Sequence, residues 1–231
     1  MIDKLAEKNN LYPLIFATAI STPNMIQHTI KLFFILLFIN AICACSDSAK
    51  LQPLHADATI LAFGDSLTYG TGTSKNKAYP AILEKLINHR VVNAGIPGEV
   101  SRDGLARLPR LLNEYQPELI IICHGANDIL RKLDLSATQN NIQKMIELAR
   151  NSNSEVVLIG VPEFGLFLDS APIYQALATE NNLPIENNVL GDILGKNALK
   201  SDHIHPNTKG YQKFAESIDA LLRQSGAIQK Q

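Results

Sequence analysis

The chain has little of several features that would place it in a special class. Its 231 residues include three cysteines and no tryptophan, and its formal net charge is −1. Three cysteines are too few for a disulfide scaffold. A domain that binds nucleic acid electrostatically carries a clear basic excess, which is missing here. Charged residues make up only 19% of the chain against 46% hydrophobic residues, which excludes disorder and indicates a globular protein. The absence of tryptophan excludes nothing.

The apolar run within residues 32–45 is too short to span a membrane. It holds about eleven strongly apolar residues, whereas a membrane helix needs roughly 20. Its position, after Lys31 and before a polar stretch, is typical of the apolar region of a secretory signal peptide. Its exit at residues 42–45 (Ile-Cys-Ala-Cys) resembles the lipobox of bacterial lipoproteins. We therefore expect lipid attachment at Cys45 and a periplasm-facing place in the bacterial cell envelope. An uncleaved signal anchor and an ordinary signal peptide are the alternatives.

Three segments follow from this interpretation. Residues 1–44 are expected to be an N-terminal extension with a signal peptide, and Met25 is the better start because it stands directly before the basic and apolar regions. Residues 45–58 are expected to form a polar tether. Residues 59–225 remain for one domain, of a size that buries about 70% of its unfolded surface. We expect this domain to be a monomer.

Within residues 59–225, apolar runs alternate with segments of helical periodicity. Strands that are apolar throughout and separated by helices indicate a parallel sheet covered on both faces. The sequence therefore predicts an α/β fold, a three-layer α/β/α sandwich of the flavodoxin-like kind, with a mostly parallel central sheet of about five strands. The expected strands are residues 59–63, 91–94, 119–123, 155–161 and 183–186, and the expected helices are residues 79–88, 104–115, 136–150, 173–180 and 208–224.

Polar residues gather after the expected strands, where parallel sheets carry their sites. Residues 64–67 (Gly-Asp-Ser-Leu) follow the first strand, and residues 95–98 (Gly-Ile-Pro-Gly) follow the second. Residues 125–128 (Gly-Ala-Asn-Asp) follow the third strand, and residues 202–206 (Asp-His-Ile-His-Pro) precede the last helix. Each block alone has an ordinary structural explanation as a helix cap or a turn. Together they suggest one site at one edge of the sheet.

In this order, the four blocks resemble those of the SGNH, or GDSL, hydrolase family. The resemblance covers residues 59–222, and residues 92–117 are similar to the subgroup of periplasmic thioesterases, lysophospholipases and arylesterases. It implies a serine hydrolase that cleaves carboxylic esters or thioesters of acyl chains, with no cofactor and no metal. A carbohydrate O-deacetylase of the same family is the alternative, and a non-catalytic lipoprotein is a third hypothesis.

The side chains of the blocks suit this chemistry. Ser66 is a nucleophile only if a base takes its proton, and His205 is the natural base. Asp202 stands three residues before His205, a spacing that lets its carboxylate reach the far ring nitrogen and fix one tautomer. Attack on an acyl carbonyl creates an oxyanion, which needs hydrogen-bond donors. The family pattern implies the N–H groups of Ser66 and Gly98 and the side-chain amide of Asn127.

Other kinds of site fit less well. Residues 202–205 with His124 offer possible metal ligands, but a proline follows them and no carboxylate cluster stands elsewhere. Residues 64–72 are rich in Gly, Ser and Thr but lack the Gly-Lys-Ser/Thr ending of a phosphate-binding loop. Thr68 stands where the nucleophile elbow of an α/β-hydrolase needs glycine.

Two apolar segments are expected to bind the acyl group of a small-molecule or lipid ester. Residues 163–168 leave the fourth strand at its carboxyl end, so they would line a groove beside Ser66. The other interpretation is that they fold back over the core. The subgroup resemblance points to the same two segments. The residues expected to line the groove are Phe164, Leu166 and Phe167 on one side and Ile129 and Leu130 on the other.

Overall fold

The structure is a computed structural model, and it describes residues 49–163 and 168–229. In this part of the chain five strands form one sheet in the order β2-β1-β3-β4-β5, with every neighbouring pair parallel. The central strand β3 is buried along its whole length. The strands are β1 (Thr59–Gly64), β2 (Arg90–Gly95), β3 (Leu119–Cys123), β4 (Glu155–Ile159) and β5 (Ile185–Glu186).

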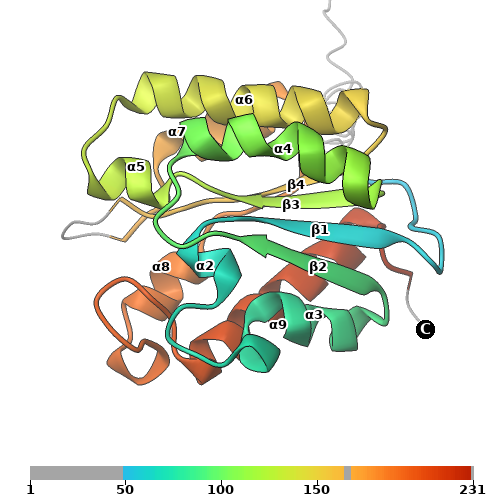
Figure 1. Cartoon of the computed structure of the whole chain (residues 1–231). Helices are drawn as coiled ribbons and strands as arrows, with labels where there is room; N and C mark the ends of the chain where they lie inside the picture. The colour runs from blue at the N-terminus through green and yellow to red at the C-terminus, as the bar shows by residue number, and fades with distance from the viewer. Residues whose placement is uncertain (1–48, 164–167, 230–231) are drawn as a thin grey trace, which may run out of the picture. The chain divides into compact units, whose positions relative to one another are not determined.

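Helices cover both faces of this sheet, which gives three layers (Figure 1). One face carries α4 (Ser101–Tyr115), α6 (Leu135–Asn151) and α7 (Pro172–Glu180). The other face carries α3 (Tyr79–Ile87), α8 (Val189–Leu194) and α9 (Thr208–Ser225). The predicted three-layer sandwich is thus confirmed. Short elements complete the domain: α2 (Ser66–Tyr69), α5 (Ala126–Leu130) and the 3-10 helices η1 (Lys75–Lys77) and η2 (Asn197–Leu199).

The spacing of apolar residues decides which helix face turns to the sheet. In α4, Leu108, Leu111 and Leu112 are buried, while Leu105 is only partly buried. Burial of one such side chain contributes about 1.5–3 kcal/mol. The same spacing orients α9, whose buried residues include Tyr211, Phe214, Ala215, Ile218 and Leu222.

Helix α4 begins three residues before its predicted start. The predicted helix began at Gly104, but the observed helix starts at Ser101 and continues through Pro109. Its start is stabilised from a distance, because Asp128 accepts hydrogen bonds from the N–H (2.8 Å) and Oγ (2.6 Å) of Ser101. This carboxylate binds the first N–H of the helix, which has no partner within the helix.

Strands β4 and β5 are shorter than predicted. β4 ends at Ile159, and β5 begins at Ile185. Pro184 precedes β5 and has no N–H to donate to the ladder, which accounts for the late start. Its carbonyl still accepts a hydrogen bond from Leu158 N–H, at 3.0 Å.

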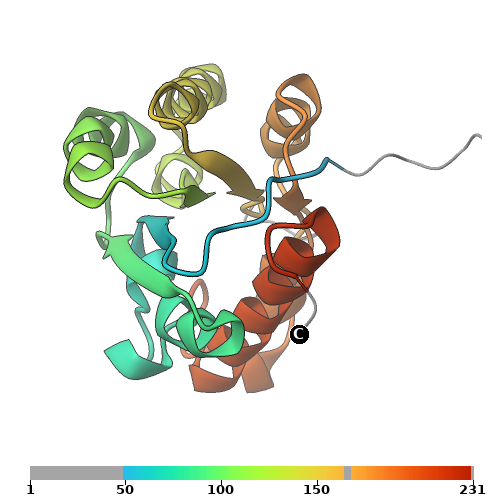
Figure 2. The same ribbon diagram turned by 90° about the vertical axis from the view of Figure 1, so that its right-hand side faces the viewer.

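The described part of the predicted tether, residues 49–58, belongs to the domain. Leu51 is buried, and its N–H donates to Ser225 O at 2.9 Å. Leu54 N–H donates to Ala227 O, also at 2.9 Å. Figure 2 shows this segment passing the end of α9. The domain therefore begins earlier and ends later than the predicted 59–225, because main-chain hydrogen bonds join its two ends.

Other predictions concern residues 1–48. The signal peptide, the start at Met25 and the lipid-modified Cys45 all lie outside the described residues. Within residues 49–163 and 168–229, no helix is both long enough and apolar enough to cross a membrane.

Candidate active site

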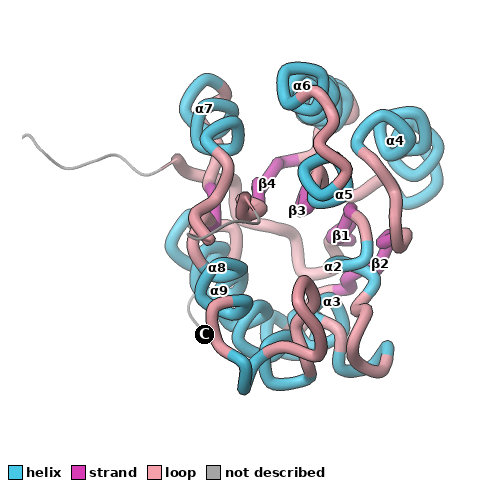
Figure 3. The backbone as a smooth tube through the Cα atoms, turned by 90° about the vertical axis from the view of Figure 1, so that its left-hand side faces the viewer, coloured by secondary structure: helices cyan, strands magenta, loops and turns pink. Residues whose placement is uncertain are grey.

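The four sequence blocks meet at the carboxyl edge of the sheet. Figure 3 views that edge and shows α2 after β1 and α5 after β3. Ser66 is the first residue of α2, and Asn127 lies in the first turn of α5. Residues 96–98 follow β2, and residues 202–206 lead into α9. Parallel strands bring these segments together because all of them end at this edge.

Ser66, His205 and Asp202 form a continuous hydrogen-bonded chain. His205 Nε2 lies 3.0 Å from Ser66 Oγ, although the two residues are 139 positions apart. On the other side of the ring, His205 Nδ1 lies 2.8 Å from Asp202 Oδ2. The His205 side chain is 14% exposed and that of Asp202 is 49% exposed. The structure thus brings together the three residues that the sequence nominated.

A local turn orients the acid and the base. Asp202 Oδ1 accepts hydrogen bonds from the N–H groups of Ile204 and His205, both at 2.9 Å. Partial burial raises the pKa of Asp202, but these bonds and the hydrogen bond from the imidazole outweigh it, so its pKa lies below the ordinary value. An ionised Asp202 favours the tautomer with the proton on Nδ1. Nε2 is then free to accept the proton of Ser66 Oγ.

The neighbouring His203 takes no part in this chain. It is exposed and makes no hydrogen bond among the described residues. Nor do three or more His, Cys, Asp or Glu side chains converge on a possible metal position in that part of the chain.

Asp65 shapes the turn that presents Ser66. Its Oδ1 accepts a hydrogen bond from Leu67 N–H at 3.0 Å and so caps α2. Asp65 is fully buried, and burial raises its pKa, with a partial offset from the hydrogen bond that it accepts from Leu67 N–H. Gly64 is required just before it, because a Cβ at that position would collide with the carbonyl oxygen of Cys123. The close approach of β1 to β3 therefore fixes where α2 begins.

The three candidate oxyanion donors are main-chain and side-chain N–H groups. Ser66 opens α2, so the helix does not use its N–H. Gly98 lies in a turn closed by a 3.2 Å hydrogen bond from Glu99 N–H to Ile96 O. Its φ of +79° is an angle that residues with a side chain rarely adopt. The side chain of Asn127 connects the turn at Gly98 with the turn at Ser66.

Asn127 contacts both neighbouring blocks. Its Nδ2 donates to Glu99 O at 3.0 Å and, over a longer 3.3 Å, to Asp65 Oδ2. Because both neighbours are acceptors, the amide nitrogen, not the oxygen, faces them. Asn127 therefore lies between the turn that carries Gly98 and the turn that presents Ser66.

Sequence reasoning missed the residues that hold these turns. Asp128 is almost fully buried and accepts hydrogen bonds from Ser101 and from Thr138 Oγ1 (3.2 Å). Arg131 Nη2 donates to Gly98 O at 2.8 Å. Only the Asn-Asp pair hinted at Asp128, and no local pattern linked it to partners 10 and 27 residues away.

One wall of the predicted acyl groove is described. Ile129 is partly buried, and Leu130 is 38% exposed. Both lie in α5, two and three residues after Asn127. Phe164, Leu166 and Phe167 of the predicted opposite wall lie outside the described residues.

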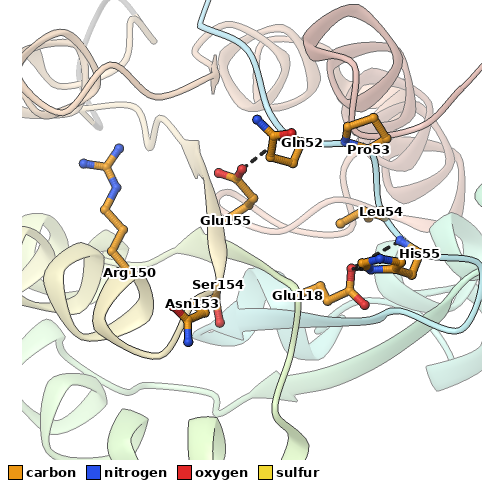
Figure 4. Close-up of a pocket in the computed structure, with 9 residues that line it drawn as sticks. All are labelled: Gln52, Pro53, Leu54, His55, Glu118, Arg150, Asn153, Ser154 and Glu155. Carbon is orange, nitrogen blue, oxygen red and sulfur yellow. Dashed lines mark hydrogen bonds and ion pairs between the residues drawn. The ribbon is translucent and has the colours of Figure 1, made fainter.

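A hollow that is separate from the candidate site lies at the opposite edge of the sheet. Its volume is about 500 Å³, and it lies at the amino ends of β3 and β4 (Figure 4). There His55 Nδ1 pairs with Glu118 at 2.9 Å, and Gln52 N–H donates to Glu155 at 3.0 Å. Ser66 stands at the other end of the strands, so this hollow is separate from the candidate site. A smaller hollow of about 290 Å³ borders Tyr69 and Gly95, next to α2.

The family match to known proteins covers the four sequence blocks. The model of the GDSL-like lipase/acylhydrolase family matches residues 62–213. Esterase TesA of Pseudomonas aeruginosa is 32% identical over 190 residues, which is 78% of this chain and 94% of that protein. Arylesterase of Vibrio mimicus is 31% identical over 203 residues, 82% of this chain and 96% of that protein. Thioesterase 1/protease 1/lysophospholipase L1 of Escherichia coli (strain K12) is 31% identical over 173 residues, 71% and 83% of the two chains.

Solved structures agree with these matches. The crystal structure of TesA shares 30% identity and a TM-score of 0.65, covering 72% of this chain and 99% of that chain. The esterase EstA from Pseudoalteromonas sp., inhibited by monoethylphosphonate, shares 26% identity and a TM-score of 0.65, covering 73% and 98%.

Proposed function

The chain belongs to the GDSL-like lipase/acylhydrolase family, and we propose that Ser66, His205 and Asp202 carry out its hydrolysis of carboxylic esters or thioesters of acyl chains. The relatives that it matches are named as an esterase, an arylesterase and a thioesterase/lysophospholipase. The observation that carries the assignment of residues is the hydrogen-bonded chain with distances of 3.0 Å and 2.8 Å. It has the order of nucleophile, base and orienting acid that acyl transfer requires.

In the first half of the reaction, Ser66 Oγ bonds to the acyl carbonyl carbon while His205 Nε2 takes the hydroxyl proton. The carbonyl electron pair moves to oxygen and forms the oxyanion. When the oxyanion collapses, the bond to the alcohol or thiol breaks, and the leaving group takes the proton from His205. The acyl group is then an ester on Ser66. Asp202 stabilises the imidazolium ion and keeps the ring in place.

In the second half, water replaces the alcohol or thiol. His205 takes a proton from water as the water oxygen bonds to the acyl carbon. Collapse of the second oxyanion releases the carboxylic acid and returns the proton to Ser66 Oγ. Both halves need donors for the oxyanion, which we assign to Ser66 N–H, Gly98 N–H and Asn127 Nδ2. Of the two Asn127 Nδ2 hydrogens, the one on the longer bond to Asp65 is the less tightly held, and we assign it to the oxyanion.

The acyl group provides a test of the substrate class. Each buried methylene contributes about 0.8 kcal/mol, close to fourfold in affinity. We expect kcat/KM for p-nitrophenyl esters to rise from acetate towards acyl chains of about six to ten carbons, by roughly this factor per methylene. Leu130→Ala should flatten the rise, as should Phe167→Ala.

Leu86→Ala provides the matched control, because Leu86 is also exposed but lies in α3. This variant should keep the chain-length dependence of the parent protein. A parent protein that hydrolyses acetate faster than octanoate would contradict the acyl groove and favour a carbohydrate O-deacetylase.

We further propose that the protein faces the periplasm and is anchored through Cys45. The support is the short apolar run and the Ile-Cys-Ala-Cys sequence at residues 42–45. Several acyl chains on one residue give stable attachment to a membrane. Intact-mass measurement of the protein from bacterial membranes should show a chain that begins at Cys45 and carries acyl groups. Cys45→Ser should accumulate as the uncleaved precursor, and an unmodified N-terminus on the parent protein would rule out the anchor.

A further inference from the structure

A largely buried ion pair next to Gly98 has no part in the steps above. Glu99 follows Gly98 directly, and its side chain is only 7% exposed. Its partners are Arg107 of α4 and His124, which follows β3. We propose that Glu99, Arg107 and His124 form a clamp that positions the oxyanion loop, residues 96–99. This inference rests on the proposed function.

Both carboxylate oxygens of Glu99 are held. Arg107 Nε donates to Oε1 at 2.9 Å and Arg107 Nη2 donates to Oε2 at 2.6 Å, so the guanidinium binds the carboxylate with two parallel bonds. Arg107 is itself fixed, because Nη2 also donates to Ala94 O at 3.0 Å. Its guanidinium carbon lies 4.6 Å from the centre of the Phe63 ring, within the range of a cation–π contact. Glu99 therefore has little freedom to move.

His124 adds a third bond to the carboxylate of Glu99. Its Nε2 lies 3.1 Å from Glu99 Oε2, and its Nδ1 accepts a hydrogen bond from Gly125 N–H at 3.2 Å. The proton of the neutral ring therefore stands on Nε2, which donates to Glu99. Gly104 makes room for the ring, because a Cβ there would collide with Nε2. Since Gly125 leads directly into α5, His124 joins the oxyanion loop to the helix that carries Asn127.

The main chain of Glu99 makes a second link to the same helix. Its carbonyl oxygen accepts the 3.0 Å hydrogen bond from Asn127 Nδ2. One residue thus adjoins the donor Gly98 and contacts the donor Asn127. A shift of Glu99 would displace both donors relative to Ser66. Misplacement by about 1 Å can cost roughly 10²-fold in rate.

Stability alone does not explain an ion pair that is largely removed from water at this position. The cost of removing two charges from water often equals or exceeds their attraction, so apolar replacements are often neutral or stabilising. Burial raises the pKa of Glu99, but the hydrogen bonds from His124 and Arg107 and the charge of Arg107 outweigh it. The pKa of Glu99 is therefore below its ordinary value, and the clamp is charged at neutral pH. A charged Glu99 that is held in place beside Gly98 and Asn127 therefore supports the proposal that the clamp positions these two oxyanion donors.

The test is a double-mutant cycle with p-nitrophenyl butyrate. Glu99→Gln removes the charge and keeps the shape, so we expect kcat to fall about 10- to 100-fold with KM within about twofold. Asn127→Ala alone should lower kcat by roughly 10²–10³-fold. Adding Glu99→Gln to Asn127→Ala should lower kcat by a smaller factor than Glu99→Gln lowers it in the parent protein, because the part of the effect that acts through Asn127 is already lost.

Asp219→Asn is the matched control, because it breaks another partly buried ion pair, the 2.9 Å Arg223–Asp219 pair within α9. It should leave kcat unchanged. If Glu99→Gln does not fold, Arg107→Lys takes its place, since it keeps the charge and loses the two-bond geometry. Fully additive losses, or a raised KM with unchanged kcat, would overturn the clamp. Full kcat in Asn127→Ala would instead reject the proposed oxyanion hole, and the clamp with it.

Discussion

Ser66→Ala is expected to lower kcat for p-nitrophenyl butyrate by about 10⁴-fold or more while the domain stays folded. Without Oγ, no covalent acyl intermediate forms, and only the oxyanion donors and substrate binding remain to help water attack. The fold should persist because Asp65 still caps α2 through Leu67 N–H. Among the described residues, the only side-chain hydrogen bond lost is the one to His205. Steady-state kinetics and thermal unfolding measure the two effects separately.

Ser74→Ala is the control for this prediction. Ser74 is an exposed serine whose Oγ bonds only to Asn76 among the described residues. Its removal should change neither kcat nor the melting temperature beyond error. A Ser66→Ala variant that keeps more than about a tenth of the parent activity would show that another group is the nucleophile, since triad losses are far larger.

Replacing each of the two histidines of residues 202–206 should have very different effects on kcat. His205→Ala is expected to lower kcat by about 10⁴-fold or more, because Ser66 then has no base. His203→Ala should cost only a modest factor, since His203 is exposed and lies outside the hydrogen-bonded chain. The double variant Ser66→Ala/His205→Ala should be no worse than either single variant, because the residues act as a unit. The reverse ranking of the histidine variants would reassign the base.

The same assignment fixes the sign of the pH dependence. A protonated His205 cannot accept the Ser66 proton, so kcat/KM should fall on acidification. Asp202 has a pKa below its ordinary value and therefore stays ionised over the pH range in which histidines titrate. The acid limb should persist in His203→Ala. Loss of that limb in His203→Ala would mean that His203, not His205, sets the pH dependence.

Much of the fold and site could be predicted because the relevant signals are local. The run Leu119–Cys123 is apolar throughout, which indicated a strand covered on both faces, and the strand is fully buried. Cys123, the last residue of this strand, is a free and buried cysteine. The Asp202–His205 pair has short-range geometry, since three residues of turn bring the carboxylate to the ring.

The supporting contacts could not be predicted because they join residues that are distant in sequence. No local pattern marks Glu99, yet it binds Arg107 and His124, 8 and 25 positions away. The start of α4 depends on Asp128, 27 residues later. The main-chain hydrogen bonds between the two ends of the domain form only in the folded chain. They do not depend on residue type, so no sequence pattern predicts them.

The most direct measurement of the central claim is peptide mapping by mass spectrometry after reaction with a p-nitrophenyl alkylphosphonate. Phosphorus takes the place of the acyl carbon, and a serine nucleophile forms a stable phosphonyl ester as p-nitrophenol leaves. We predict one adduct per chain, on the peptide that contains Ser66. Ester hydrolysis should fall in proportion to the fraction of labelled chains and be lost when all chains are labelled. His205→Ala should label far more slowly. Loss of activity with the adduct on any other residue, or an unlabelled Ser66 in an inactivated protein, would contradict Ser66 as the nucleophile.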